Sequence, residues 1–176
     1  MVGEVLNSYR LTLDYLHRLV ADVPDSDLGR QPAGVANHPA WVIGHLTYSC
    51  QVLGGMLGLT AWLPAGWEGR FGTGSVPTPD PSARPPKAEL LAALADGRAR
   101  VSDRLAGLGD AGMGAPLPDE RYRAVFPTVG HVVVHILAGH TAVHVGQVSV
   151  WRRAAGYPPL SEAAAEPVAP ADGGGR

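Results

Sequence analysis

Four long stretches of the chain repeat their apolar residues at helical spacing, and no stretch of useful length alternates in the manner of a β-strand. These stretches are residues 2–23, 38–60, 86–108 and 128–155. Each has an apolar face that must be buried against another element. The pattern therefore predicts an all-α protein, and four helices of this length favour a four-helix bundle.

The connection between the second and third stretches is unusually long for a compact domain. Residues 64–86 contain six prolines and four glycines, so we expect a long crossover loop there, which could also be a lid or a mobile segment. Asn37 is placed to cap the second helix, with Pro39 in its first turn. Residues 161–176 have too little apolar content to pack, which predicts a bundle over 1–160 and a disordered tail.

Composition and charge exclude several classes of protein. The formal net charge is −2, which argues against a nucleic-acid-binding protein. No eighteen consecutive residues are apolar, and the first ten lack the apolar region of a secretory signal. The one cysteine, Cys50, excludes an intrachain disulfide and a cysteine-based zinc site. We therefore expect a soluble, cytoplasmic protein that acts on a small molecule.

The fourth stretch carries two pairs of histidines at i, i+4 spacing. His140 and His144 lie about 40° apart around the helix axis, so both rings point the same way, on an apolar face that predicts an inward orientation. His131 and His135 fall on the opposite face, which is small and polar, and we expect them to be solvated or at an interface. This spacing alone fits two hydrogen-bonded core histidines as well as it fits a metal site.

A third histidine would favour a metal ion, and the second stretch offers two on one helix face. His38 and His45 lie two turns apart, about 10 Å, so they cannot bind the same ion. His45 lies in mid-helix, where a site in the bundle core would be, whereas His38 lies at the start of the helix. We expect His45 to join His140 and His144, with His38 as the rival ligand.

Two motifs carry a resemblance to a known family. The string HTAVHVGQ (140–147) resembles the last-helix motif of the DinB/YfiT-like superfamily, and NHPAWVIGHL (37–46) resembles its second-helix motif. The ending RRAAGYPP (152–159) is also similar. The resemblance implies a four-helix bundle that holds a divalent ion on three histidines, nickel or zinc first and iron or manganese next. It also implies relatives that are S-transferases or isomerases dependent on bacillithiol, mycothiol or glutathione.

Three neutral nitrogen ligands leave at least one open position, which is typical of a catalytic metal site. A metal ion there lowers the pKa of a bound water or thiol and so generates a nucleophile. The side chains expected to support the ligands or line a pocket are Gln147, Tyr48, Trp41, His38 and Arg98. Structural roles are open for the same residues: a packing amide for Gln147, a core position for Tyr48, and an edge-of-stripe position for Arg98.

Three functions follow from these expectations. The first is a metal-dependent enzyme, either a low-molecular-weight-thiol S-transferase or isomerase or a hydrolase. The alternative is a non-catalytic, metal-binding or stress-associated dimeric bundle, and the third is an interaction module without metal. Four small residues favour self-association as a homodimer through the outward face of the last helix, unless they pack within their own bundle: Gly139, Ala142, Gly146 and Ser149.

Overall fold

The fold is all-helical, as predicted. The computed structural model describes residues 1–32 and 34–160, and these contain no β-strand, only an isolated bridge between Pro116 and Thr128. The predicted tail, 161–176, lies outside the described residues. The long helical segments are α1 (Val2–Val20), α2 (Pro39–Met56), α4 (Lys87–Met113) and a last segment made of α5 (Val129–Val134), the π-helical turn η4 (His135–His140) and α6 (Thr141–Ala154).

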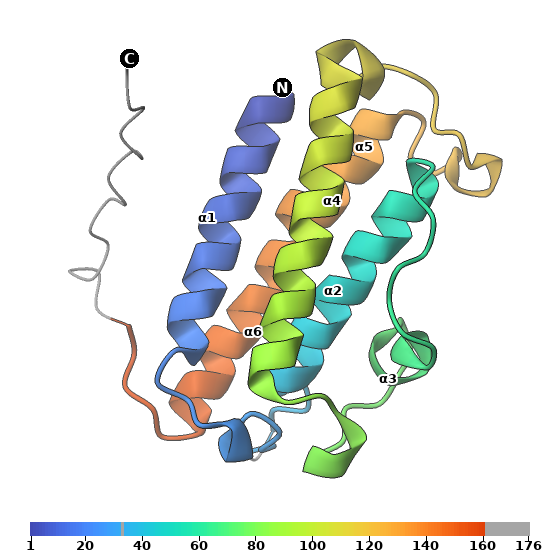
Figure 1. Ribbon diagram of the computed structural model, residues 1–176. Coiled ribbons are helices and arrows are strands. Elements are labelled where there is room, and N and C mark those ends of the chain that lie inside the picture. Colours follow the sequence, from blue (N-terminus) through green and yellow to red (C-terminus); the bar gives the residue numbers. More distant parts are fainter. Residues whose placement is uncertain (33, 161–176) are drawn as a thin grey trace, which may run out of the picture.

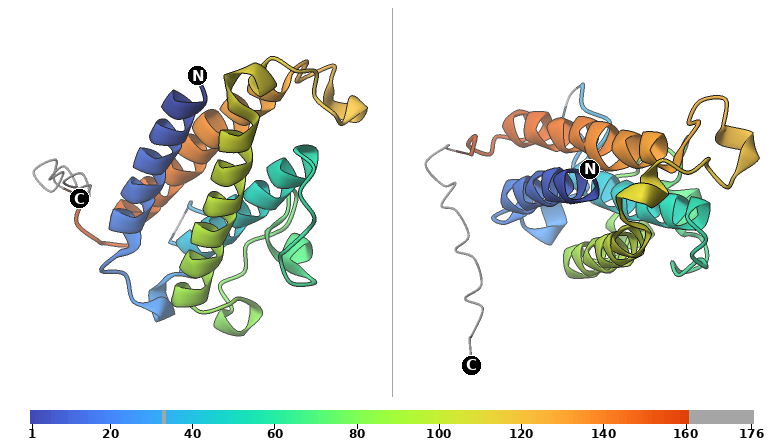
Figure 2. Two further views of the ribbon diagram at one scale, coloured as in Figure 1. Left: turned by 45° about the horizontal axis from the view of Figure 1, so that its top comes forward. Right: turned by 90° about the horizontal axis from the view of Figure 1, so that it is seen from above.

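The long segments lie side by side (Figure 1). Figure 2, seen from above, shows α1 and α2 between α4 on one side and the last segment on the other. In Figure 1, α2 and α4 run in the same direction. The connection between them must therefore return along the length of the molecule, and it carries the short helix α3 (Trp67–Phe71) back against α2.

Helix α2 is the most enclosed of the long helices. Its residues 39–47 are all buried, because α4, α3 and α6 pack around it. Its apolar residues therefore lie on all sides rather than on one face, as expected for a helix inside the core. This placement puts the middle of α2, and His45 with it, inside the protein.

Three predicted helix ends are wrong for identifiable reasons. The first helix ends at Val20 rather than at residue 23, because the Lys87 ammonium donates to the carbonyls of Val20, Ala21 and Val23. The second helix ends at Met56 rather than at residue 60, just before Gly58, whose φ of 87° favours glycine and ends a helix. The third continues to Met113 instead of 108, through a kink at Gly109, whose φ of 61° favours glycine.

The last segment follows one continuous helical path, but its backbone hydrogen bonding is not α-helical throughout. The single helix predicted over 128–155 is interrupted by the π-helical turn, in which backbone bonds run from i to i+5. The Ile136 carbonyl accepts from the Thr141 backbone N–H, five residues on, and also from the Thr141 hydroxyl at 2.8 Å. A π turn changes which side chains share a face, and this one ends at His140.

One stretch among the described residues, Val129–Ala154, is long and apolar enough to cross a membrane by length and composition alone. It carries all the histidines of the last segment and packs against α1 and α2. This is the packing of a core helix, and it fits a soluble protein.

Candidate metal centre

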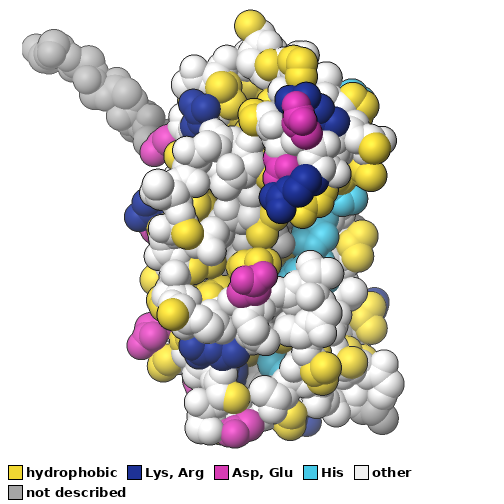
Figure 3. All heavy atoms as spheres, turned by 90° about the vertical axis from the view of Figure 1, so that its right-hand side faces the viewer, with side chains coloured by type: hydrophobic (Ala, Val, Ile, Leu, Met, Phe, Trp, Pro, Cys, Tyr) yellow, Lys and Arg dark blue, Asp and Glu magenta, His cyan; other side chains and the backbone are white. Residues whose placement is uncertain are grey.

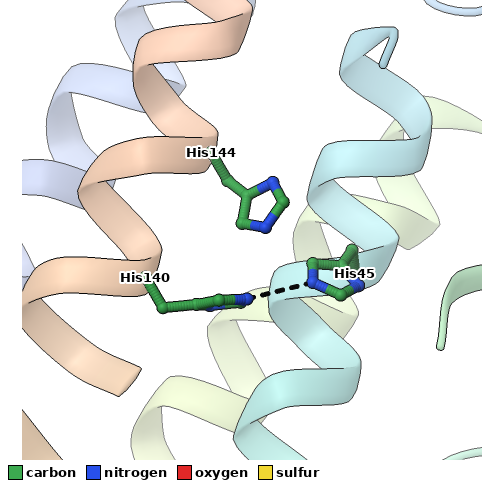
Figure 4. A group of neighbouring side chains, drawn as sticks. All are labelled: His45, His140 and His144. Atoms are coloured by element: carbon green, nitrogen blue, oxygen red, sulfur yellow. Dashed lines mark hydrogen bonds between the residues drawn. The ribbon is translucent and has the colours of Figure 1, made fainter. Parts of the chain in front are cut away.

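Three histidine rings from two helices converge between α2 and the last segment. His45 comes from the middle of α2, His140 ends the π-helical turn, and His144 lies in the first turn of α6. One ring nitrogen from each lies within 4.8 Å of the others, and His45 Nε2 is 3.1 Å from His140 Nε2. Figure 4 shows the rings pointing toward one another across the gap between the helices. These three nearby histidines could bind a metal ion.

His45 is held on two sides. Its Nδ1 lies 2.7 Å from the carbonyl oxygen of Phe71, which only accepts, so Nδ1 carries the proton and Nε2 keeps a lone pair, which faces His140 Nε2 at 3.1 Å. The indole of Trp41 stacks on the imidazole, with ring centroids 4.6 Å apart and planes 9° apart. The Trp41 Nε1 donates in turn to Ser75 Oγ at 2.9 Å. Phe71, which holds His45, and Ser75, which holds Trp41, both lie in the connection between α2 and α4.

His144 is oriented by an amide. Its Nδ1 donates to Gln147 Oε1 at 3.0 Å, and the same oxygen accepts from Asn37 Nδ2 at 3.0 Å. Gln147 therefore lies between His144 and the residues that lead into α2. Asn37 was expected to cap α2; instead the His38 imidazole does so, which leaves the Asn37 amide free to reach Gln147.

His140 is the least supported of the three rings. Its Nδ1 is buried and has no hydrogen-bond partner among the described residues. Burial lowers the pKa of His140 to about 4, and the neighbouring His144 and His45 rings add to the effect. Burial also lowers the pKa values of His45 and His144. All three rings are therefore neutral at pH 7, the state in which imidazole binds a metal ion.

The donor set fits a divalent ion such as zinc or nickel. Metal–nitrogen bonds of about 2.0–2.1 Å place two nitrogens of a tetrahedral site about 3.3 Å apart. The 3.1 Å between Nε2 of His45 and Nε2 of His140 is close to this separation. His140 and His144 are only half-buried, so the cluster is reachable from outside, and Figure 3 shows histidine side chains at the surface in a hollow of one face. Three nitrogen ligands with an accessible side leave room for a further ligand.

The second histidine pair of the last segment stays outside the cluster. His131 and His135 are both exposed, and His131 Nδ1 lies 2.8 Å from Thr128 Oγ1. The expectation that His135 lies opposite His140 is wrong, because their ring centroids are 6.5 Å apart. The π-helical turn accounts for this, since it aligns residues five apart instead of four.

The remaining candidates lie at different distances from the cluster. His38 Nδ1 accepts from the Trp41 backbone N–H and its Nε2 donates to the Thr78 carbonyl, so neither ring nitrogen is free for a metal ion. Arg98 Nη1 lies 4.0 Å from Asp14 of α1, at the contact between α1 and α4. Tyr48 is half-buried one turn beyond His45. Burial raises the pKa of Tyr48 to about 12, and the neighbouring Glu68 carboxylate adds to the effect.

The sequence alone did not identify the contributions of α3 and the connection around it. Phe71 acts through its backbone carbonyl, which no residue type can signal. Trp67 and Phe71 are both buried, with ring centroids 5.1 Å apart. Two aromatic residues four apart in a stretch rich in proline were the one available sign that this segment docks on the core.

The fold is all-helical, and three histidines from two of its long segments lie together. The protein is therefore a helical protein with a candidate metal-binding site. The DinB superfamily model matches residues 8–148, and the chain belongs to that superfamily. The match includes all three histidines of the cluster. No curated protein is a significant match to the chain.

Proposed function

We propose that His45, His140 and His144 bind one divalent ion, nickel or zinc first and iron or manganese next, within a four-helix bundle of the DinB type whose crossover is the connection from α2 to α4. The convergence of three neutral imidazoles carries this proposal. On this basis the protein is a cytoplasmic, metal-dependent enzyme. Its reaction is transfer of a low-molecular-weight thiol, mycothiol or bacillithiol, to a small electrophile, the related isomerisation, or hydrolysis.

Different residues of the chain orient the ligands of such a site and shield it from water. Phe71 and Gln147 hold the Nδ1 protons of His45 and His144, so the opposite nitrogens are presented to the ion. Trp41 covers one side of His45 and excludes water from it. A divalent ion bound there supplies Lewis acidity, which lowers the pKa of a thiol or water at its open position.

A screen of metal-loaded protein tests the catalytic proposal. Mycothiol, bacillithiol and water are each offered as the nucleophile with a panel of small electrophiles, and loss of the electrophile is followed. We expect turnover with the wild-type protein and none with His144→Ala. Stoichiometric metal without turnover would favour the alternative, a non-catalytic metal-binding or stress-associated bundle. Absence of metal from protein purified without an affinity tag would favour an interaction module.

Metal affinity is expected to change little between pH 7.5 and 6.5. Three histidines with an ordinary pKa near 6.5 would each be half-protonated at pH 6.5, and affinity would fall about sixfold between these pH values. Since the pKa values of His45, His140 and His144 are lowered, proton competition begins at lower pH. Residue type alone, with ordinary histidine pKa values, would predict the fall near pH 6.5. Titration of zinc against a competing chelator at both pH values distinguishes the two expectations.

Lowered histidine pKa values also affect the stability of the metal-free protein. The unfolded chain binds more protons than the folded one between about pH 6.5 and the folded pKa of His140, about 4. The free energy of unfolding therefore falls as the pH is lowered through this window. Urea unfolding of the metal-free protein at pH 7 and pH 5 measures it, and equal stabilities would contradict the assigned pKa directions.

We also propose that α6 mediates self-association. Val143 is 63% exposed and Val150 49% exposed, and they flank a groove of about 570 Å³ that Gly146 also lines. Gly139, Ala142 and Gly146 are exposed, which allows a second helix to approach closely. Ser149 is the exception among the small residues, because it is half-buried and its hydroxyl lies 3.3 Å from that of Tyr15.

Replacing Val143 with glutamate is expected to convert a dimer into a monomer, because the charge would be buried in an apolar contact. Sedimentation at tens of micromolar measures the change. Val76 is 84% exposed in the connection after α2, so Val76→Glu is the matched control and should leave the mass unchanged. A monomeric wild-type protein at this concentration would contradict self-association.

A further inference from the structure

Helix α3 packs tightly against α2 one residue before His45. A Cβ atom built on Gly44 would lie 2.3 Å from Phe71 Cδ1 and 2.5 Å from Phe71 Cγ. Ordinary carbon–carbon contacts begin at about 3.5 Å, so no residue other than glycine fits at position 44 unless the ring moves. The clash involves the root of a buried ring, not the end of a flexible side chain.

Three contacts of α3 meet on the two residues Gly44 and His45. The Phe71 ring lies against the bare backbone of Gly44, and the Trp67 Nε1 donates to the Gly44 carbonyl at 3.0 Å. The Phe71 carbonyl accepts from His45 Nδ1 at 2.7 Å. The ring is buried and packs against Trp67, with ring centroids 5.1 Å apart, so it has little room to turn about its own side-chain bonds. A group placed against the ring from Gly44 would therefore displace the backbone of Phe71, and its carbonyl with it.

We propose that α3 is a positioning element for the metal centre, and that Gly44 and Phe71 are its positioning residues. The close approach of the Phe71 ring to Gly44 brings the Phe71 carbonyl within reach of His45 Nδ1, which fixes both the tautomer and the direction of the ring. This inference rests on the proposed metal site, because fixing His45 matters for function only if Nε2 is a ligand. It gives the glycine before His45 in the second-helix motif a physical role.

The length of the hydrogen bond makes the arrangement sensitive to small changes. Restoring an ordinary contact between a Cβ at position 44 and the Phe71 ring requires a shift of about 1 Å. A similar shift of the carbonyl would stretch the 2.7 Å bond to His45 beyond the range of a hydrogen bond. His45 would then lose its fixed tautomer, and a fraction of the molecules would present a protonated Nε2 to the ion.

Gly44→Ala is the first test, and Gly55→Ala is its matched control. Both glycines lie in α2, but a Cβ at Gly55 would meet no atom within 4 Å. Loss of an outer partner of a ligating histidine typically weakens metal binding about 10–100-fold. We expect zinc affinity, measured by competition with a chromogenic chelator, to fall by that factor in Gly44→Ala and to be unchanged in Gly55→Ala.

Imidazole nitrogen NMR of the metal-free protein provides a readout that general destabilisation would not mimic. Wild-type His45 should show a protonated Nδ1 and an unprotonated Nε2, whereas Gly44→Ala should show a mixture of tautomers. The opposite tautomer in the wild-type protein would overturn the proposal, and this measurement needs no variant to fold. It also separates the two ideas, because a fixed His45 tautomer without zinc binding would refute the metal site and leave the positioning contact intact.

The double variant Gly44→Ala/Phe71→Ala tests the clash itself. If Gly44→Ala acts only by displacing the Phe71 ring, it should have no further effect on zinc affinity once that ring is removed. The double variant should therefore bind zinc as Phe71→Ala does. Additive losses, or wild-type affinity in a folded Gly44→Ala protein, would overturn the proposal.

Discussion

His144→Ala is expected to weaken binding of the divalent ion by more than about 100-fold, so that the protein is purified without metal. Loss of an outer partner of a ligating histidine costs about 10–100-fold, and loss of the ligand itself must cost more. His144 lies in the three-histidine cluster with its Nδ1 already held by Gln147, so its opposite nitrogen has no role other than that of a ligand in this account. Elemental analysis of protein produced without an affinity tag measures the loss.

His131→Ala is the matched control on the same segment. His131 is exposed and hydrogen-bonded to the Thr128 hydroxyl, away from the cluster, so its removal should leave one ion per chain. If His131→Ala lost the ion while His144→Ala kept it, the assignment of the inward pair would be wrong. The catalytic proposal would fail with it.

Removal of the ion is expected to lower the melting temperature by about 8–16 °C. An ion present at a thousand times its dissociation constant stabilises the folded state by about 4 kcal/mol. One kcal/mol corresponds to about 2–4 °C for a domain of this size. The ion would also join α2 to the last segment, which are far apart in the chain. Thermal unfolding with zinc in excess and after chelation gives the difference.

The same comparison with His144→Ala shows whether the effect belongs to the site. Zinc should leave the melting temperature of this variant unchanged, because one of its ligands is missing. Equal stabilisation of both proteins by zinc would mean that the ion binds elsewhere. If zinc did not stabilise the wild-type protein, this would contradict a metal site that forms only in the folded protein.

The features predictable from the sequence are those set by helical spacing. Apolar periodicity without strand alternation predicted an all-helical protein, and the described residues form one. The four-residue spacing of His140 and His144, together with the mid-helix position of His45, predicted which histidines would lie together. These predictions succeeded because α2 is a regular helix around His45, and because the π-helical turn ends at His140, so that the turn from His140 to His144 is α-helical.

Features that depend on backbone irregularity or on distant contacts could not be predicted. The π-helical turn brings His135 beside His140, which the spacing of a regular helix excludes. The capping of α2 by His38 depends on its bond to Thr78, forty residues along the chain. The Phe71 carbonyl on His45 belongs to the backbone, so no side-chain pattern indicates it.

Anomalous diffraction at the absorption edge of the metal, from crystals of zinc-loaded protein, tests the central claim most directly. The account predicts one peak per chain, about 2.0–2.1 Å from the Nε2 atoms of His45, His140 and His144. A peak on His131 or His135, or no ordered metal in protein that is otherwise folded as described, would contradict it.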